Sequence, residues 1–164
     1  MGVACNVILA PNILTLRNNW KRHFNYFKDK NMIAKDRKTF FAPELFINNG
    51  VTDISFYENA FGALEQMRFN NDDGSIHVVE LSIDGAIFHI HEITPKQYFF
   101  SPDRNHGTTI CIGLFVSDVD EVMSKAVKAG GTEINPAQDY EYGYRQGTIK
   151  DPFGHYWQIQ KQIS

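Results

Sequence analysis

Residues 55–63 read SFYENAFGA, and residues 151–157 read DPFGHYW. The first stretch carries apolar side chains at the spacing of one helix face and then reaches a glycine, a residue that ends helices readily. The second combines a proline, which presets φ, with a glycine, which supplies a positive φ, and aromatic residues follow. The first stretch therefore predicts a helix with a glycine stop, and the second predicts a tight turn that leads into a strand.

The same succession of patterns occurs twice. Residues 42–91 can be laid on residues 111–160 without a gap, and similar residue types then coincide, although few are identical. The coincident pairs include Phe46 with Phe115, Ala60 with Ala129, Gly62 with Gly131, Gly85 with Gly154, Phe88 with Trp157 and Ile90 with Ile159. Each copy predicts a short strand, an amphipathic helix, a glycine stop and three more strands. The sequence thus indicates an α+β fold built from an internal repeat of two βαβββ modules.

The helix of the second copy has clear end signals. Ser117 or Asp118 can cap it, apolar residues recur every three or four positions across residues 119–127, and Gly130-Gly131 ends it. Three strands are then expected, at residues 132–137, 144–150 and 155–160. His155, in the turn before the last strand, is expected to be exposed.

The helix of the first copy is less sharply marked. Asn48 or Asn49 is expected at its start and Gly62 at its end, and its apolar stripe comprises Ile54, Tyr57, Phe61 and Leu64. The strands expected after it are residues 64–69, 76–83 and 86–93. Residues 94–108, with two prolines and Gly107, are interpreted as the linker between the modules.

Composition limits the class of protein. The chain has 164 residues, of which 43% are hydrophobic and 13% aromatic, enough to bury a core. The sequence contains neither an apolar run long enough to span a bilayer nor a signal-peptide pattern, so a soluble, cytoplasmic protein without a membrane partner is expected. Cys5 and Cys111 lie far apart and form no CxxC motif, which argues against a disulfide framework.

Charge is unevenly distributed. The net charge is −3, yet residues 1–38 contain eight Lys or Arg and two Asp, and residues 1–41 are interpreted as a basic N-terminal extension. This segment could be a basic arm for nucleic acid, a loosely attached extension, or residues upstream of a start at Met32. No recognition motif accompanies the basic residues, so a nucleic-acid partner is not predicted.

Several motifs, taken in order, resemble those of the vicinal-oxygen-chelate superfamily, in its glyoxalase/bleomycin-resistance/dioxygenase and PhnB-like branches. These motifs are SFYENAFGA at 55–63, VSDVD at 116–120, AGG at 129–131 and DPFGHYW at 151–157. The resemblance covers residues 42–162, with module one at 42–93 and module two at 109–162. It implies curved mixed sheets that form an open cleft, assembly as a homodimer and, in many members, a divalent metal held by one residue from the first and last strand of each module.

Strand alternation predicts which side chains line that cleft. Residues that pack on the helices alternate with residues on the opposite face, because successive side chains of a strand point to opposite sides. The residues expected in the cleft are Ala42, Glu44, Phe46, Ile87, His89, His91, Ile93, Thr109, Cys111, Gly113, Phe115, Tyr156, Gln158 and Gln160. Of these, Glu44, Phe46, Phe115, Tyr156, Gln158 and Gln160 are predicted to bind a ligand.

The resemblance places the four metal-ligand positions at Ala42, His89, Cys111 and Gln158. Alanine has no donor, and glutamine replaces the usual carboxylate, so His89 and Cys111 are the metal ligands that remain. His91 shares the face of His89, and Glu44 could reach in from the first strand. The histidines could instead form hydrogen bonds within a polar cleft or act as general bases without metal, and Cys111 could be a small buried residue.

Two functions follow from the resemblance. One is an enzyme, a lyase, isomerase or dioxygenase, with His89, His91 and Cys111 as catalytic residues. The alternative is a protein of bleomycin-resistance type that sequesters a small aromatic or cationic compound without chemistry, because aromatic faces stack on flat ligands. A small-molecule ligand is expected in both cases, and a divalent metal is a possible cofactor.

Overall fold

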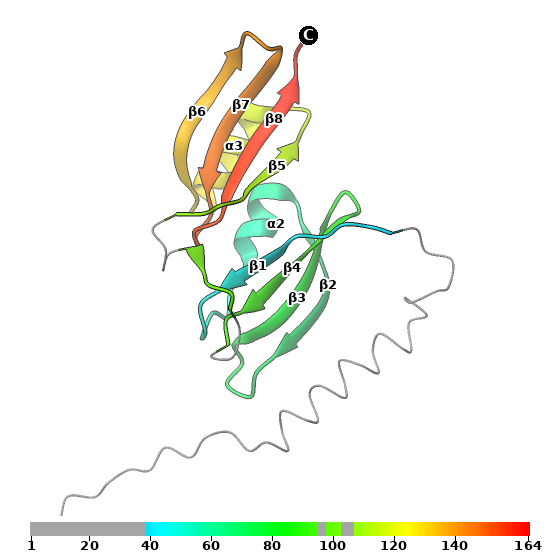
Figure 1. The fold of residues 1–164 in the computed structure, drawn as a ribbon, viewed down its shortest axis with the longest axis vertical. Coiled ribbons are helices and arrows are strands. Elements are labelled where there is room, and N and C mark those ends of the chain that lie inside the picture. Colours follow the sequence, from blue (N-terminus) through cyan, green and yellow to red (C-terminus); the bar gives the residue numbers. More distant parts are fainter. Residues whose placement is uncertain (1–38, 95–97, 103–106) are drawn as a thin grey trace, which may run out of the picture. The chain divides into compact units, whose positions relative to one another are not determined.

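The computed structural model describes residues 39–94, 98–102 and 107–164. The predicted basic extension falls, up to residue 38, outside the described residues, and so do parts of the predicted linker. The described chain forms two βαβββ modules, each with one helix and a four-stranded mixed sheet (Figure 1). The α+β fold class expected from the sequence is therefore confirmed. No helix among the described residues is long and apolar enough to cross a membrane.

Module one contains the first four strands and one helix. Its elements are β1 (Glu44–Ile47), α2 (Ser55–Phe61), β2 (Leu64–Asn70), β3 (Ile76–Ile83) and β4 (Ala86–Glu92). The strand order is β1-β4-β3-β2, and β1 pairs with β4 in parallel while the other pairs are antiparallel. The first strand thus lies beside the last strand of its module.

Module two repeats this arrangement. Its elements are β5 (Cys111–Phe115), α3 (Val119–Lys128), β6 (Thr132–Tyr140), β7 (Tyr144–Lys150) and β8 (Tyr156–Gln162). The strand order is β5-β8-β7-β6, again with one parallel pair, β5 and β8. The cross-strand register also agrees between the modules, since Glu44 pairs with His89 and Gly113 pairs with Gln158, the positions that coincide in the sequence alignment.

The two helices start differently. The backbone N–H of Glu121 donates to the Asp118 side chain over 3.0 Å, so Asp118 is the cap expected from the sequence. The capping role proposed for Asn48 or Asn49 is wrong, because α2 begins at Ser55 after Ile54, which provides no side-chain cap. Helix α2 ends at Phe61, its C-cap Gly62 has a φ of 67°, and β2 begins two residues later at Leu64. Leu64 therefore belongs to β2 and is exposed.

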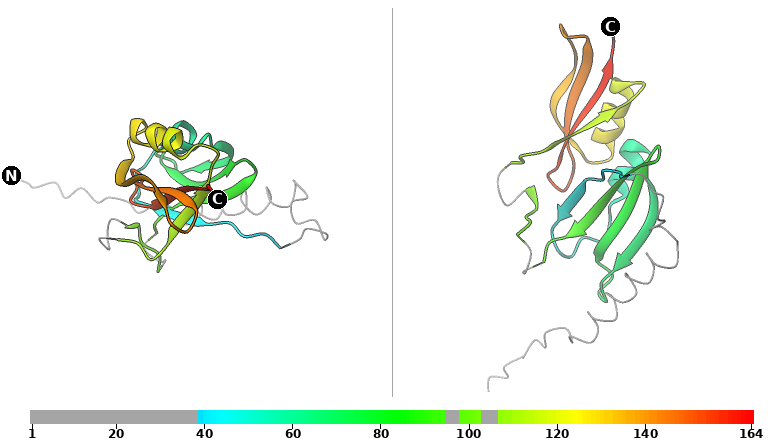
Figure 2. Two further views of the ribbon diagram at one scale, coloured as in Figure 1. Left: turned by 90° about the horizontal axis from the view of Figure 1, so that it is seen from above. Right: turned by 45° about the vertical axis from the view of Figure 1, so that its right-hand side comes forward.

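The modules share one hydrophobic core on the helix side of their sheets. The helices α2 and α3 lie side by side (Figure 2). The Tyr57 ring of module one lies 5.9 Å from both Phe153 and Trp157 of module two, measured between ring centroids. Phe61 and Phe88 also contact Trp157. Aromatic packing therefore holds one module against the other.

A buried carboxylate, Asp151, lies at this junction. Its Oδ2 accepts hydrogen bonds from the Tyr57 hydroxyl over 2.8 Å and from Trp157 Nε1 over 3.0 Å. Its Oδ1 accepts from the backbone N–H groups of Phe153 and His155, both over 2.9 Å. His155 Nδ1 lies 3.2 Å from Oδ2, and His155 is buried, so the expectation that it is exposed was wrong. Asp151 thus fixes its own turn and ties module two to α2.

Candidate functional site

Each sheet presents one face to its helix and the core and an opposite face, called here the open face. In module one, Leu45, Ile47, Phe88 and Ile90 belong to the core. Since strand side chains alternate, the residues between and beside them occupy the open face. On β1 and β4 these are Glu44, Phe46, Ile87, His89 and His91.

A row of three titratable side chains crosses the open face of module one. His89 on β4 pairs with Glu44 on β1 and with Glu80 on β3, so the three residues lie on adjacent strands in register. His89 Nε2 lies 3.2 Å from Glu80 Oε2. Glu80 is only 7% exposed, and a buried carboxylate is costly unless it has a hydrogen-bond partner. The imidazole of His89 therefore serves as the partner of a buried acid.

A second row on the same face is aromatic. Phe46 pairs with His91 across β1 and β4, and the two rings stack with centroids 5.7 Å apart. Phe99 also stacks on Phe46, with ring centroids 4.5 Å apart. Nearby, the Ser101 hydroxyl, fully buried, donates to Asn48 Oδ1 over 2.8 Å. Residues 98–102 thus approach the end of β1, and one aromatic ring lies against the open face.

The two rows bring three potential metal ligands together. Glu44, His89 and His91 each offer one ligand atom, and these atoms all lie within 4.8 Å of one another. The His89 and His91 rings are 5.9 Å apart between centroids. Cys111, predicted from the sequence to join His89 as a ligand, is not a member of this group.

On the open face of module two, the positions that match Glu44, His89 and His91 carry no charged group. Register pairs Cys111 with Tyr156, Gly113 with Gln158, and Phe115 with Gln160. Gln146 Nε2 donates to Gln160 Oε1 over 2.7 Å, and the Tyr142 hydroxyl donates to Gln146 Oε1. Gly113 makes room for this network, since a Cβ there would lie 2.8 Å from Gln160 Nε2. Amides and hydroxyls can both donate and accept, so this face suits an uncharged polar ligand.

The surroundings of Cys111 do not favour the thiolate form that a nucleophile or a metal ligand requires. The residue is exposed at the surface of module two. Partial burial of the thiol raises its pKa, and a hydrogen bond from the Gln158 backbone only partly opposes that effect. Because the thiolate is the nucleophile and the metal ligand, a raised pKa works against both predicted roles.

The positions expected from the family resemblance do not fit a family-type metal. Ala42 has no donor, and Gln158 offers only a neutral amide in place of a carboxylate. Cys111 adds a thiol that is held neutral. This donor set lacks the negative charge that stabilises a bound divalent cation, so no chemistry is assigned to a metal shared by these four positions.

Sequence reasoning missed the importance of Glu80. His77, the other histidine near Glu80 on β3, pairs instead with Glu92, with His77 Nδ1 2.7 Å from Glu92 Oε1. The partner of Glu80, His89, is a cross-strand neighbour. Alternation indicates the face of Glu80, but the pairing depends on strand register, which the sequence leaves open.

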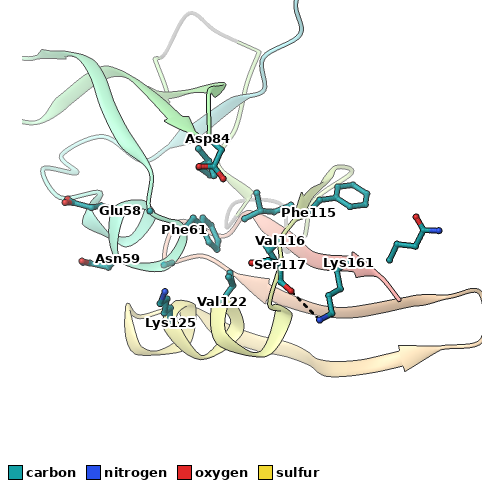
Figure 3. A pocket seen from close by; sticks show the side chains of 15 residues that line it. Glu58, Asn59, Phe61, Asp84, Phe115, Val116, Ser117, Val122, Lys125 and Lys161 are labelled. Carbon is teal, nitrogen blue, oxygen red and sulfur yellow. Dashed lines mark hydrogen bonds between the residues drawn. The ribbon is translucent and has the colours of Figure 1, made fainter. Parts of the chain in front are cut away.

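A cavity of about 630 Å³ lies where the modules meet (Figure 3). Apolar side chains from both modules form part of its wall, and Lys161 Nζ donates to the Ser117 carbonyl at its edge over 3.3 Å. Its lining comprises Glu58, Asn59, Ala60, Phe61, Gly62, Ile83, Asp84, Leu114, Phe115, Val116, Ser117, Val122, Lys125, Lys161 and Gln162. Phe115 lines it, whereas Glu44, His89 and His91 do not, so the cavity is distinct from the polar face of module one.

The fold and the polar open faces define the class of protein. The sequence profile described as "Glyoxalase/Bleomycin resistance protein/Dioxygenase superfamily" matches residues 44–159, and the chain belongs to this superfamily. The resemblance inferred from the sequence motifs is therefore confirmed.

Related sequences come from bacteria and plants. Uncharacterized protein Rv0887c from Mycobacterium tuberculosis is 31% identical over 125 residues, which are 74% of this chain and 74% of that protein. The protein At5g48480 from Arabidopsis thaliana is 29% identical over 112 residues, 63% of this chain and 66% of its own. The structure of its gene product superimposes with a TM-score of 0.61 and 25% identity, covering 76% of this chain and all of that one.

Two further solved structures share the fold. TioX from Micromonospora sp. ML1 gives a TM-score of 0.57 at 25% identity and covers 76% of this chain and 100% of its own. The fosfomycin resistance protein FosX from Listeria monocytogenes gives 0.55 at 17% identity and covers 76% of this chain and 93% of its own. At that identity, the FosX likeness concerns the fold alone.

Proposed function

We propose that this chain binds a flat, aromatic small molecule with its open faces. The observation that carries the proposal is the row formed by Glu44, His89 and Glu80, because it places two carboxylates and an imidazole on a sheet face. Burying a carboxylate is costly, and a few polar groups that converge on one face are typical of ligand sites. The carboxylate of Glu44 would hold a donor group or positive charge of the ligand.

Module two would supply the surface for the body of the ligand. Tyr156 and Phe115 offer aromatic area, and Gln158 and Gln160 offer amide groups that select polar edges. The superfamily description includes bleomycin resistance proteins, which supports a binding role without chemistry. Both modules would therefore contact the ligand.

A thermal-shift screen tests this function. Protein treated with a chelator is heated with a panel of flat aromatic amines and phenols, and a bound compound at about 100 times its Kd adds roughly 2.7 kcal/mol to the free energy of unfolding. We expect a raised melting temperature in the wild type and a smaller rise in Glu44→Gln and Gln160→Ala. Glu121→Gln, on the exposed side of α3, is the matched control. Equal shifts in all four proteins would place binding elsewhere, such as in the cavity, and contradict the proposal.

Catalysis is a second candidate function, favoured by the Glu80–His89 pair. A carboxylate that holds one nitrogen of an imidazole orients the ring and supports its use as a general base. The chain would then be a lyase, isomerase or dioxygenase, as the superfamily description allows. Once a ligand is found, mass spectrometry of the mixture distinguishes the two functions. An enzyme requires a product from the wild type and none from His89→Asn, while a binding protein returns the compound unchanged.

We also propose that the chain acts as a homodimer. Large apolar side chains outside the proposed ligand surface are exposed, with Leu64 and Ile110 each at least 65% accessible. Exposed apolar surface of this kind is typical of association sites. Light scattering after gel filtration should give twice the mass of the chain, and a single-chain mass at micromolar concentration would contradict this.

A further inference from the structure

We propose that the open face of module one is a binding site for a divalent transition metal, with Glu44, His89 and His91 as its ligands. The ligand atoms of the three residues lie within 4.8 Å of one another, close enough to share one ion after small rotamer changes. This inference rests on the proposed function, because the metal would lie at the polar end of the proposed ligand site and would bind the small molecule there. It concerns one sheet alone and needs no residue of module two.

Strand register explains why these three side chains converge. Glu44 and His89 are direct partners in the parallel pair of β1 and β4, and their side chains point to the same face. His91 lies two residues beyond His89, so it returns to that face one step along the strand. The His89 and His91 rings are already perpendicular neighbours at 5.9 Å. The site is thus supported by regular strands, which hold ligands more rigidly than loops do.

Glu80 provides an independent observation that points to a metal. Metal-binding histidines usually donate their second ring N–H to a carboxylate, which fixes the tautomer and the ring orientation. His89 Nε2 has such a partner in Glu80 Oε2 at 3.2 Å, and Glu80 is a buried residue of the same open face. This pairing leaves Nδ1 of His89 as the nitrogen for the ion. Glu80 is therefore a positioning residue for the site.

Ligand chemistry indicates the class of metal. Two imidazoles and one carboxylate suit Zn²⁺, Fe²⁺, Co²⁺ or Ni²⁺, whereas Mg²⁺ and Ca²⁺ prefer oxygen ligands throughout. Three protein ligands also leave coordination positions open, as in catalytic zinc sites and in iron centres with two histidines and one carboxylate. A bound ion would replace the direct contact of Glu44 with the small molecule and would supply a Lewis acid for one of its oxygen or nitrogen atoms.

Calorimetric titration with Zn²⁺ tests the site. The full chain, without a histidine tag and after chelator treatment, is titrated near neutral pH, and one ion per chain is expected. Glu80→Gln should weaken binding by roughly 10–100-fold, as the loss of an outer-shell partner does. His91→Ala and Glu44→Gln should weaken it further, since each removes a ligand. Melting curves of the apoproteins verify that every variant is folded.

Two control variants make the result specific. His77→Ala removes a histidine of the same sheet that pairs with a carboxylate, Glu92, yet lies outside the cluster, so Zn²⁺ affinity should be unchanged. Cys111→Ser removes the thiol of module two and should also leave the affinity unchanged. Absence of Zn²⁺ binding, binding that survives both His91→Ala and Glu44→Gln, or loss of binding in Cys111→Ser would each overturn the proposal. Because the ligand screen uses metal-free protein, failure of the metal site is distinguishable from failure of ligand binding.

Discussion

The open faces of the two modules have the same backbone frame but different chemistry. Where module one places Glu44 beside His89, module two places Gly113 beside Gln158, and where module one places Phe46 beside His91, module two places Phe115 beside Gln160. At these positions module one thus has a carboxylate and two imidazoles, and module two has a glycine and two neutral amides. The difference suggests a division of tasks, in which module one anchors the ligand and module two shapes the surface around it.

The largest effect is expected where the two modules are joined. Asp151→Ala would leave the Tyr57 hydroxyl and Trp157 Nε1 without their buried acceptor, and it would also free the two backbone N–H groups of the turn. Removing one partner from a buried, charged hydrogen-bond network costs about 3–5 kcal/mol. Denaturant unfolding of this variant measures the loss. The exposed Asp72→Ala should change stability by less than about 0.5 kcal/mol, and equal effects of both would refute the role of Asp151.

Acid should weaken the same junction. Burial opposes ionisation of Asp151, but hydrogen bonds from His155, Trp157 and Tyr57 outweigh it and lower the pKa of the carboxyl. A group with a lowered pKa in the folded state stabilises the protein above its unfolded pKa, and this stability is lost as the pH falls through the folded pKa. The melting temperature of the wild type should therefore fall from neutral pH into the acid range. Asp151→Asn should flatten this profile, and parallel curves would argue against the assignment.

Replacing the two histidines of module one by the glutamines of module two tests whether the open faces differ in function. The double variant His89→Gln/His91→Gln copies Gln158 and Gln160 onto the matching positions of β4. Because a glutamine amide can still donate to the Glu80 carboxylate, we expect a stability loss of only about 1–2 kcal/mol. Zn²⁺ binding should disappear, as measured by the same titration. A variant that still binds Zn²⁺ would show that the two faces do not differ in this function.

The smallest effect is expected on module two. In Gly113→Ala, the new Cβ would meet Gln160 Nε2 at 2.8 Å, and that atom is the end of a flexible side chain that can move. Stability should change by less than about 1 kcal/mol, because the strain is relieved at the surface. Ligand-induced stabilisation should nevertheless decrease, since Gln160 is displaced from Gln146. An unchanged thermal shift with the same compounds would remove the amide network from the ligand site.

Sequence patterns predicted the modules well because they rest on local chemistry. Alternation, the Asp118 cap and the Gly62 stop each depend on neighbouring residues, and the structure contains all of them. The start of α2 was misplaced, because the asparagines that resemble caps lie in the loop after β1. The burial of His155 was not predicted, because a turn is usually exposed. Here His155 contacts the buried Asp151 side chain and is itself buried.

The candidate site depends on long-range register, which the sequence only partly reveals. Alternation predicted that Glu44, His89 and His91 share a face. It could not show that Glu80 lies beside His89, because that contact requires the pairing of β3 with β4. Nor could it separate Cys111 from the histidines, since the family resemblance grouped residues of both modules. The cluster seen in one sheet emerged only from the three-dimensional structure.

Histidine side-chain NMR tests the central claim most directly, namely that the anchoring chemistry lies on the open face of module one. The chain has six histidines, and their imidazole signals can be assigned by substitution and followed during Zn²⁺ addition. We expect the signals of His89 and His91 to shift together up to one equivalent of Zn²⁺, while those of His77 and His155 stay in place. Shifts at His77 or His155 of equal size, or no shift at His89 and His91, would contradict it.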